Sequence, residues 1–144
     1  MARIRIHFPE NISFQCEIPV RITDINYGGH VGNDRILSLI HEARMRWLQQ
    51  YGYTEMNLAG CGLIMADAGI EFKTEIFYGD PLLISVAVGE ITRIGFELFY
   101  KLEKESAGQK TIAALAKTGM ICYDYEAKKI TGIPEELGKM LRGG

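Results

Sequence analysis

The stretch DRILSLIHEARMRWLQQY, residues 34–51, determines the predicted fold because it is the one clear helical segment in the sequence. Its apolar residues recur at the spacing of one helix face: Ile36, Leu39, Ile40, Ala43 and Trp47. Asn33 or Asp34 is expected to cap the first turn, and Gly52 is expected to end the helix. The apolar arc is broad for a surface helix, which predicts a concave partner wrapped around it.

Patterns of period two on both sides of this helix predict β-strands. A first strand is expected from about Phe14 to Ile22, and alternating apolar residues fill most of the chain from Leu63 to Tyr125. A short helical turn is expected at 54–58, and Pro134 is expected to open a short C-terminal helix. The order predicts one α+β domain, residues 1–144, with a long helix on one face of an antiparallel sheet.

The final strand of this sheet is expected to lie in its interior. The run from Thr111 to Tyr125 is apolar on both faces in places, which is typical of a central strand. This two-sided character also predicts that part of the sheet meets another subunit.

Composition and charge exclude several function classes. The chain has 144 residues, of which 47% are hydrophobic, and a formal net charge of -2 without any long basic block, so no nucleic-acid partner is expected. Cys16, Cys61 and Cys122 are widely separated, which favours neither a metal site nor a disulfide framework and fits a reducing compartment. No signal-peptide core and no apolar run of membrane-spanning length are present, so the expected location is the cytoplasm, without a membrane partner.

The segment VRITDINYGGHVGN, residues 20–33, carries the candidate chemistry. It joins a strand to the start of the long helix, where backbone N–H groups are unpaired and the helix dipole is positive. Such groups suit a carbonyl oxygen that becomes an oxyanion during acyl transfer. Gly28 and Gly29 allow close approach of a ligand, and Asp24, Asn26 and His30 could position or activate water.

A family resemblance follows from the same residues. The pattern Arg21-x-x-Asp24-x-Asn26-x-x-Gly29-His30-Val31-Gly32-Asn33, followed by Glu42-Ala43-Arg44, resembles the hotdog acyl-CoA thioesterases of the 4-hydroxybenzoyl-CoA thioesterase type. Their motif runs R-x-x-D-x-D-x-x-G-H-V-N-N, before a helix with E-x-A-R. The Tyr78–Leu82 turn and the Ile133–Leu137 ending resemble later landmarks of that family. The resemblance implies a curved antiparallel sheet around one helix, in homodimers or homotetramers with active sites at the subunit interface.

The resemblance also implies roles for individual residues. In many members the second acidic residue of D-x-D is the nucleophile or general base, but here it is Asn26, which cannot ionise. We therefore expect Asn26 to position the substrate or water. The candidate bases are Asp24, then Glu42, with His30 as a third. The substrate is expected to contact Gly28, Gly29, Val31 and Asn33, and the backbone N–H groups from Gly29 to Val31 are expected to point into a pocket.

Two functions remain open from the sequence. The favoured one is hydrolysis of an acyl-CoA, or an acyl-carrier thioester, without a metal or other cofactor. The alternative is a non-catalytic acyl-CoA or acyl-carrier binding module on the same fold. Individual residues also have structural interpretations: Asp24 and Asn26 suit turns, Asn33 suits a helix cap, and Glu42 suits a surface ion pair with Arg46.

Overall fold

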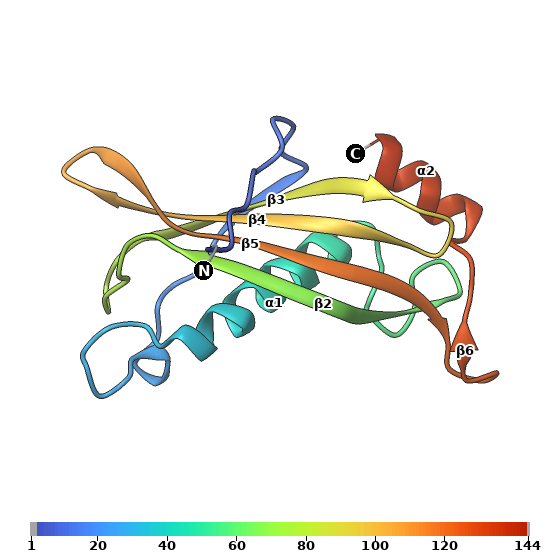
Figure 1. Cartoon of the computed structure of the whole chain (residues 1–144), viewed down its shortest axis with the longest axis horizontal. Helices are drawn as coiled ribbons and strands as arrows, with labels where there is room; N and C mark the ends of the chain where they lie inside the picture. The colour runs from blue at the N-terminus through green and yellow to red at the C-terminus, as the bar shows by residue number, and fades with distance from the viewer. Residues whose placement is uncertain (1–2, 144) are drawn as a thin grey trace.

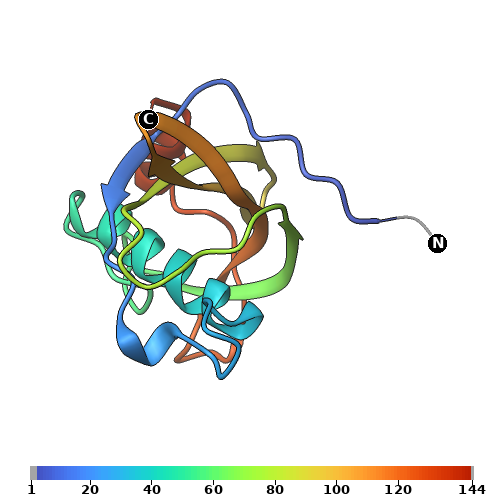
Figure 2. The same ribbon diagram turned by 90° about the vertical axis from the view of Figure 1, so that its left-hand side faces the viewer.

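A curved antiparallel sheet holds a long helix in its concave face, as two views of the computed structural model show (Figures 1 and 2). The structure describes residues 3–143, and the predicted α+β hotdog architecture is confirmed. The elements are β1 (Phe14–Glu17), the 3-10 turn η1 (Ile22–Asp24), α1 (Asn33–Gln49), β2 (Gly62–Phe72), β3 (Leu82–Ile91), β4 (Gly95–Ser106), β5 (Gln109–Asp124), β6 (Lys129–Ile130) and α2 (Glu135–Gly143).

The strands pair in the order β1-β3-β4-β5-β2, with β6 beside the end of β5. β4 and β5 form a hairpin, and its turn residues Ala107 and Gly108 both have positive φ, as a tight hairpin turn requires. β5 pairs with β4 on one side and with β2 and β6 on the other, so its predicted interior position is also confirmed. β2 follows α1 in the chain, and among the described residues 3–143 it pairs with β5 alone, which leaves β2 as an edge strand.

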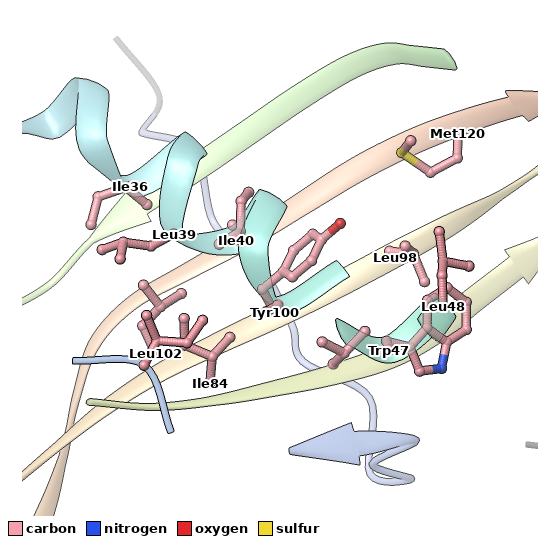
Figure 3. Close-up of a cluster of buried hydrophobic side chains, with 14 of the residues drawn as sticks. Ile36, Leu39, Ile40, Trp47, Leu48, Ile84, Leu98, Tyr100, Leu102 and Met120 are labelled. Atoms are coloured by element: carbon pink, nitrogen blue, oxygen red, sulfur yellow. The ribbon is translucent and has the colours of Figure 1, made fainter. Parts of the chain in front are cut away.

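The core lies between α1 and the concave face of the sheet (Figure 3). The predicted apolar face of α1 is buried against alternate residues of β3, β4 and β5. The largest fully buried side chains of this core include Leu39, Ile40, Trp47, Leu48, Ile84, Leu98, Tyr100, Leu102 and Met120. Burial at about 25 cal/mol per Å² of apolar surface makes this contact the main stabilising term of the fold.

The first strand is shorter than its pattern predicts. Ile18 still donates its N–H to the Leu82 carbonyl, at 3.0 Å, but Pro19 has no N–H to continue the ladder. The chain leaves the sheet there and forms η1, so the expected end at Ile22 is wrong. Ile18 and Val20 are nevertheless buried, which explains why the alternation extends beyond the strand.

Two local helical expectations are also wrong. Gly32, rather than Asn33 or Asp34, is the residue before the first turn of α1, and within residues 3–143 no side chain caps that turn. The segment 54–58 forms narrow turns closed by the bridges Thr54↔Asn57 and Leu58↔Cys61 instead of a helical turn. The side chain of Asn57 accepts a hydrogen bond from Gly60 N–H, which is turn chemistry rather than helix chemistry.

The N-terminal segment covers part of the outer face of the sheet. Ile6 donates its N–H to the Glu71 carboxylate at 3.0 Å, and the Lys101 ammonium lies 5.0 Å from the Phe8 ring centroid. Leu115, an outward apolar residue of β5, is buried beside this segment. At this position the outer face of β5 is therefore covered by the N-terminal segment of the same chain.

A matched pair of substitutions tests the core. Ile84 on β3 is 0% exposed and Ile130 on β6 is 50% exposed. We expect Ile84→Ala to lower the free energy of unfolding by about 2–5 kcal/mol, because it leaves a cavity beneath α1. Ile130→Ala should change it by less than about 0.5 kcal/mol. Urea denaturation measures both, and equal losses would contradict the core described here.

Candidate active site

The loop before α1 is a small, fully folded hairpin. Asn26 and His30 face each other across it, with Asn26 N–H donating to the His30 carbonyl at 2.9 Å. Gly29 closes the turn with φ of 86°, and its N–H donates to the Asn26 carbonyl at 3.1 Å. The Asn26 side-chain oxygen also accepts the Gly28 N–H at 2.9 Å. Asn26 is thus a turn residue, in agreement with its structural interpretation. Its side-chain nitrogen remains available for other contacts.

The side chain of Asp24 points into η1 and not toward Asn26. Its carboxylate accepts the backbone N–H of Arg21 at 2.8 Å and two guanidinium hydrogen bonds, at 3.2 and 3.3 Å. On an extended chain Asp24 and Asn26 would point the same way, but the chain turns at η1, and Asp24 takes up the turn position that its structural interpretation gave it. Of the Asp24 side chain, 0% is exposed to solvent.

The contacts with Arg21 also determine the charge state of Asp24. Burial raises the pKa of the Asp24 carboxyl, but the Arg21 hydrogen bonds and the guanidinium charge outweigh burial and leave that pKa below its ordinary value. The same pair raises the pKa of Arg21, chiefly through the side-chain hydrogen bond. Asp24 is therefore an ionised anchor that holds the start of the loop.

Gly32 brings a second carboxylate close to the loop. A Cβ atom at Gly32 would lie only 2.6 Å from Oδ1 of Asp34 and 3.9 Å from the amide nitrogen of Asn26. The family pattern has Asn at this position, whose side chain would collide with Asp34 here. The two departures from that pattern, Asn26 and Gly32, therefore lie side by side, with Asp34 against them.

The backbone donors at the helix start are only partly free. The expectation that the N–H groups from Gly29 to Val31 point into a pocket is wrong for Gly29, bonded to Asn26, and for Val31, which donates to Ile76 at 2.7 Å. Within residues 3–143, the N–H groups of His30 and Asn33 make no hydrogen bond. These two donors, with the positive end of the α1 dipole, can stabilise a negative oxygen.

A pocket of about 220 Å³ opens beside these donors. His30, Val31 and Asn33 line it from the loop and helix start, and residues 72–76 line it from the end of β2. The His30 Nδ1 atom lies 3.2 Å from the Val31 carbonyl, which only accepts, so Nδ1 carries the hydrogen and Nε2 is free to accept one. The loop motif, the free donors and an accepting imidazole thus meet at one pocket.

Glu42 lies on a different side of α1. Its carboxylate accepts a hydrogen bond from Arg46 at 2.9 Å, the expected i,i+4 pair, and Arg46 also donates to the Glu17 carbonyl of β1. Burial raises the pKa of Cys16 on β1, with Arg46 lowering it and Glu42 raising it, which places Glu42 toward that strand. The structure therefore does not bring Glu42 together with the pocket.

A polar cluster on α1 was missed by the sequence analysis. His41 bonds Glu55, and Glu55 in turn bonds the buried Arg44. Burial lowers the pKa of Arg44, but Tyr100 and Glu55 outweigh this and raise it, so the guanidinium stays charged. No local pattern signals a contact between a helix residue and Glu55, which lies in a segment expected to be helical.

Neither a metal site nor a membrane span is found in the described part of the chain. Within residues 3–143, no three His, Cys, Asp or Glu side chains gather to hold a metal ion. No helix over the same range is long and apolar enough to cross a membrane.

Comparison with curated proteins gives matches along most of the chain. The chain is 28% identical over 121 residues to a 1,4-dihydroxy-2-naphthoyl-CoA hydrolase of Microcystis aeruginosa, covering 82% of this chain and 85% of that protein. It is 26% identical over 136 residues to the 1,4-dihydroxy-2-naphthoyl-CoA hydrolase of Nostoc punctiforme, covering 90% and 87%.

Comparison with solved structures gives the same fold. A 1,4-dihydroxy-2-naphthoyl-CoA thioesterase of Synechocystis superposes with a TM-score of 0.79 at 23% identity, covering 90% of this chain and 95% of that one. An Asp-to-Asn variant of 4-hydroxybenzoyl-CoA thioesterase, complexed with 4-hydroxybenzoyl-CoA, gives 0.80 at 15% identity, covering 89% and 97%. The family described as the thioesterase-like superfamily matches residues 20–141. The chain therefore belongs to the thioesterase-like superfamily and has its hotdog fold.

Proposed function

We propose that this protein is an acyl-CoA thioesterase, which hydrolyses an acyl-CoA to a free acid and CoA without a metal or other cofactor. The observation that carries the proposal is the pocket at the start of α1. There the free N–H groups of His30 and Asn33 meet the end of the helix dipole. The names of the relatives, which are CoA hydrolases and thioesterases, support the same reaction.

The loop residues have separate roles in this proposal. The thioester carbonyl oxygen lies against the N–H groups of His30 and Asn33, which stabilise it when it becomes an oxyanion. Gly28 and Gly29 have no side chains, so the substrate can approach the backbone of the loop closely. Val31 holds the loop in place through its N–H, which donates to the Ile76 carbonyl. Asn26 presents its amide nitrogen to the substrate or to the attacking water, while its oxygen holds the turn.

Asp24 is assigned here to positioning rather than proton transfer. A general base must reach the water that it activates. The Asp24 carboxylate is fully enclosed and already accepts three hydrogen bonds from Arg21. His30 remains a candidate proton acceptor through Nε2, and Glu42 is disfavoured by its position toward β1.

The working assembly in this proposal is a homodimer, joined by the edges of two β2 strands. β2 has 11 residues and pairs with β5 on one side only (Figure 1). Met65 and Phe72 on this strand are exposed, and a long edge with exposed apolar residues favours pairing with another strand. A two-fold axis across β2 would pair the strands antiparallel, which extends the sheet through both subunits.

A reducing compartment, such as the cytoplasm, is the proposed location. The three cysteines, Cys16, Cys61 and Cys122, are few and widely separated in the sequence, which is the usage typical of compartments that keep thiols reduced.

The proposed function is tested by hydrolysis of a substrate panel. Purified protein is mixed with aliphatic, benzoyl-type and 1,4-dihydroxy-2-naphthoyl-CoA thioesters, and the released thiol is followed with a chromogenic disulfide. We expect saturable hydrolysis of at least one thioester. Binding of a thioester by calorimetry without any release of thiol would instead support the non-catalytic binding module.

The role of Asn26 gives a prediction about two substitutions. Asn26→Ala removes both the turn acceptor and the amide donor, so kcat should fall by about 10²–10³. Asn26→Asp keeps the acceptor for Gly28 N–H and restores the family's carboxylate, so the loop should stay folded and the hydrolysis rate should be preserved or raised. A complete loss of activity in Asn26→Asp, with the melting temperature unchanged, would show that the amide itself is needed.

The Asp24 anchor gives a prediction about stability and pH. Asp24→Asn weakens the contacts with Arg21 and should lower the free energy of unfolding by about 1 kcal/mol at pH 7. The pKa of Asp24 is lower in the folded protein than in the unfolded chain. The stabilisation by Asp24 is therefore complete when the pH lies above the unfolded-state pKa, and it is lost as the pH falls through the folded-state pKa. The stability difference between the wild type and Asp24→Asn should therefore shrink below about pH 4. A difference that grows on acidification would contradict the anchor role.

A further inference from the structure

A chain of buried polar groups runs from the core of the sheet to the surface of α1. Thr118 and Tyr100 lie at its inner end, with their hydroxyl oxygens 2.8 Å apart. Arg44 of α1 donates to the Tyr100 hydroxyl at 3.1 Å and to the Glu55 carboxylate at 2.8 Å. Arg44 is only 5% exposed, and burial of a guanidinium is strongly unfavourable unless its charge is paired. Charged residues are almost never buried without a paired group, so the position of Arg44 calls for an explanation that the apolar core around it does not.

The chain of polar groups ends at an exposed imidazole. Glu55 Oε1 lies 2.6 Å from His41 Nε2, while its other oxygen holds Arg44. A carboxylate bound to a guanidinium accepts hydrogen bonds and does not donate, so Nε2 of His41 carries the hydrogen. In the neutral ring Nδ1 then has a free lone pair, and 52% of the side chain is exposed. An imidazole oriented by a carboxylate in this way is a general-base arrangement.

His41 also lines a pocket. A hollow of about 190 Å³ lies between α1 and β2, and Leu37, His41 and Met65 are among its lining residues. Leu37 and Met65 are exposed apolar side chains, so the imidazole is placed beside an apolar surface at the free edge of β2. An apolar surface next to a basic nitrogen suits the acyl part of a thioester rather than a highly charged group.

The loop and His41 of one chain are too far apart to act on the same atom. His41 lies eight positions after Asn33, or about 12 Å along the helix axis. A reacting carbonyl has to lie roughly 3 Å from both the oxyanion donors and the attacking water. The His41 imidazole therefore cannot serve a thioester bound at the loop of its own chain.

Pairing of two β2 edges removes this obstacle. α1 and β2 run in opposite directions (Figure 1), so the helix start lies beside Phe72, and His41 lies beside Met65. When two β2 strands pair antiparallel, the Met65 end of one chain meets the Phe72 end of the other. The His41 pocket of one chain then faces the loop of its partner.

We propose that His41, held by Glu55, is the general base for a thioester bound at the loop of a second copy of this chain. The inference rests on the proposed function. A water oxygen attacks the thioester carbonyl carbon, and Nδ1 of His41 takes a proton from that water. The N–H groups of His30 and Asn33 hold the oxyanion. The carbon–sulfur bond then breaks, the sulfur leaves with the bonding electrons, and the imidazolium returns the proton to the thiolate.

Two histidine variants test the base. His41→Gln keeps a donor for Glu55 but has no basic nitrogen, whereas His7→Gln changes an exposed histidine on the outer face of the sheet. We expect kcat to fall about 10²–10⁴-fold in His41→Gln, with a melting temperature close to wild type, and to stay unchanged in His7→Gln. Glu55 and Arg44 are the charged groups bonded into this site, so Glu55→Gln should reduce kcat less than His41→Gln does.

The pH profile separates a chemical role from a structural one. The kcat/KM of the wild type should fall on the acid side, and this limb should be absent from the residual activity of His41→Gln. An unchanged acid limb, or an unchanged kcat, overturns the role of His41. If the wild type hydrolyses no thioester of the panel, the proposed function itself has failed, which is a distinct result.

A hybrid dimer tests whether His41 acts across the interface. Two chains with different affinity tags are co-expressed, one carrying His41→Gln and the other Asn26→Ala, and the species with both tags is purified. In this dimer one site combines an intact loop with an intact partner His41, so about half of the wild-type activity should return. No recovery above the two parent variants, full activity of the Asn26→Ala protein, or an active monomer by light scattering would each overturn the proposal.

Discussion

Burial of the apolar stripe of α1 in the concave face of one sheet is the constraint on which the rest of this structure depends. The sheet has to curve to cover Leu39, Ile40, Trp47 and Leu48, and Figure 2 shows the strands arching around the helix. A curved sheet with one filled face needs few loops inside it, so most polar residues lie at the ends and edges. The exception is the chain of Thr118, Tyr100 and Arg44, which crosses the core and ends near the edge of β2.

The same burial fixes the direction of the helix and therefore of its dipole. Ile36 is buried in the first turn, so the start of α1 cannot tilt away from the end of β2. The free backbone N–H groups of His30 and Asn33 are therefore held in place by the buried side chains that follow them on α1, beginning with Ile36. A site of this kind is preorganised by the core, which is more rigid than a loop alone.

Much of the fold follows from periodicity, because a single segment of period 3.6 stands among segments of period two. The ends of the elements do not follow from periodicity. β1 stops before Pro19, which has no backbone N–H to donate, and Gly32 precedes α1 without a side-chain cap. The motif locates the loop correctly, but the direction of Asp24 depends on the 3-10 turn that its own side chain stabilises. The contacts of Arg44 are still harder to anticipate, because Tyr100 lies 56 residues away and Glu55 lies in turns with no periodic pattern.

The strand order also has a consequence for how the chain folds during its synthesis. α1 and β2 are complete by residue 72, but β3, β4 and β5, which cover α1, extend to residue 124, and β5 is the strand that pairs with β2. At about 5–20 residues per second, the ribosome needs several seconds to deliver that remaining stretch. During this interval most of the apolar stripe of α1 and the edge of β2 that pairs with β5 lack their native partners, so the nascent chain is a natural client for chaperones that bind exposed apolar helices.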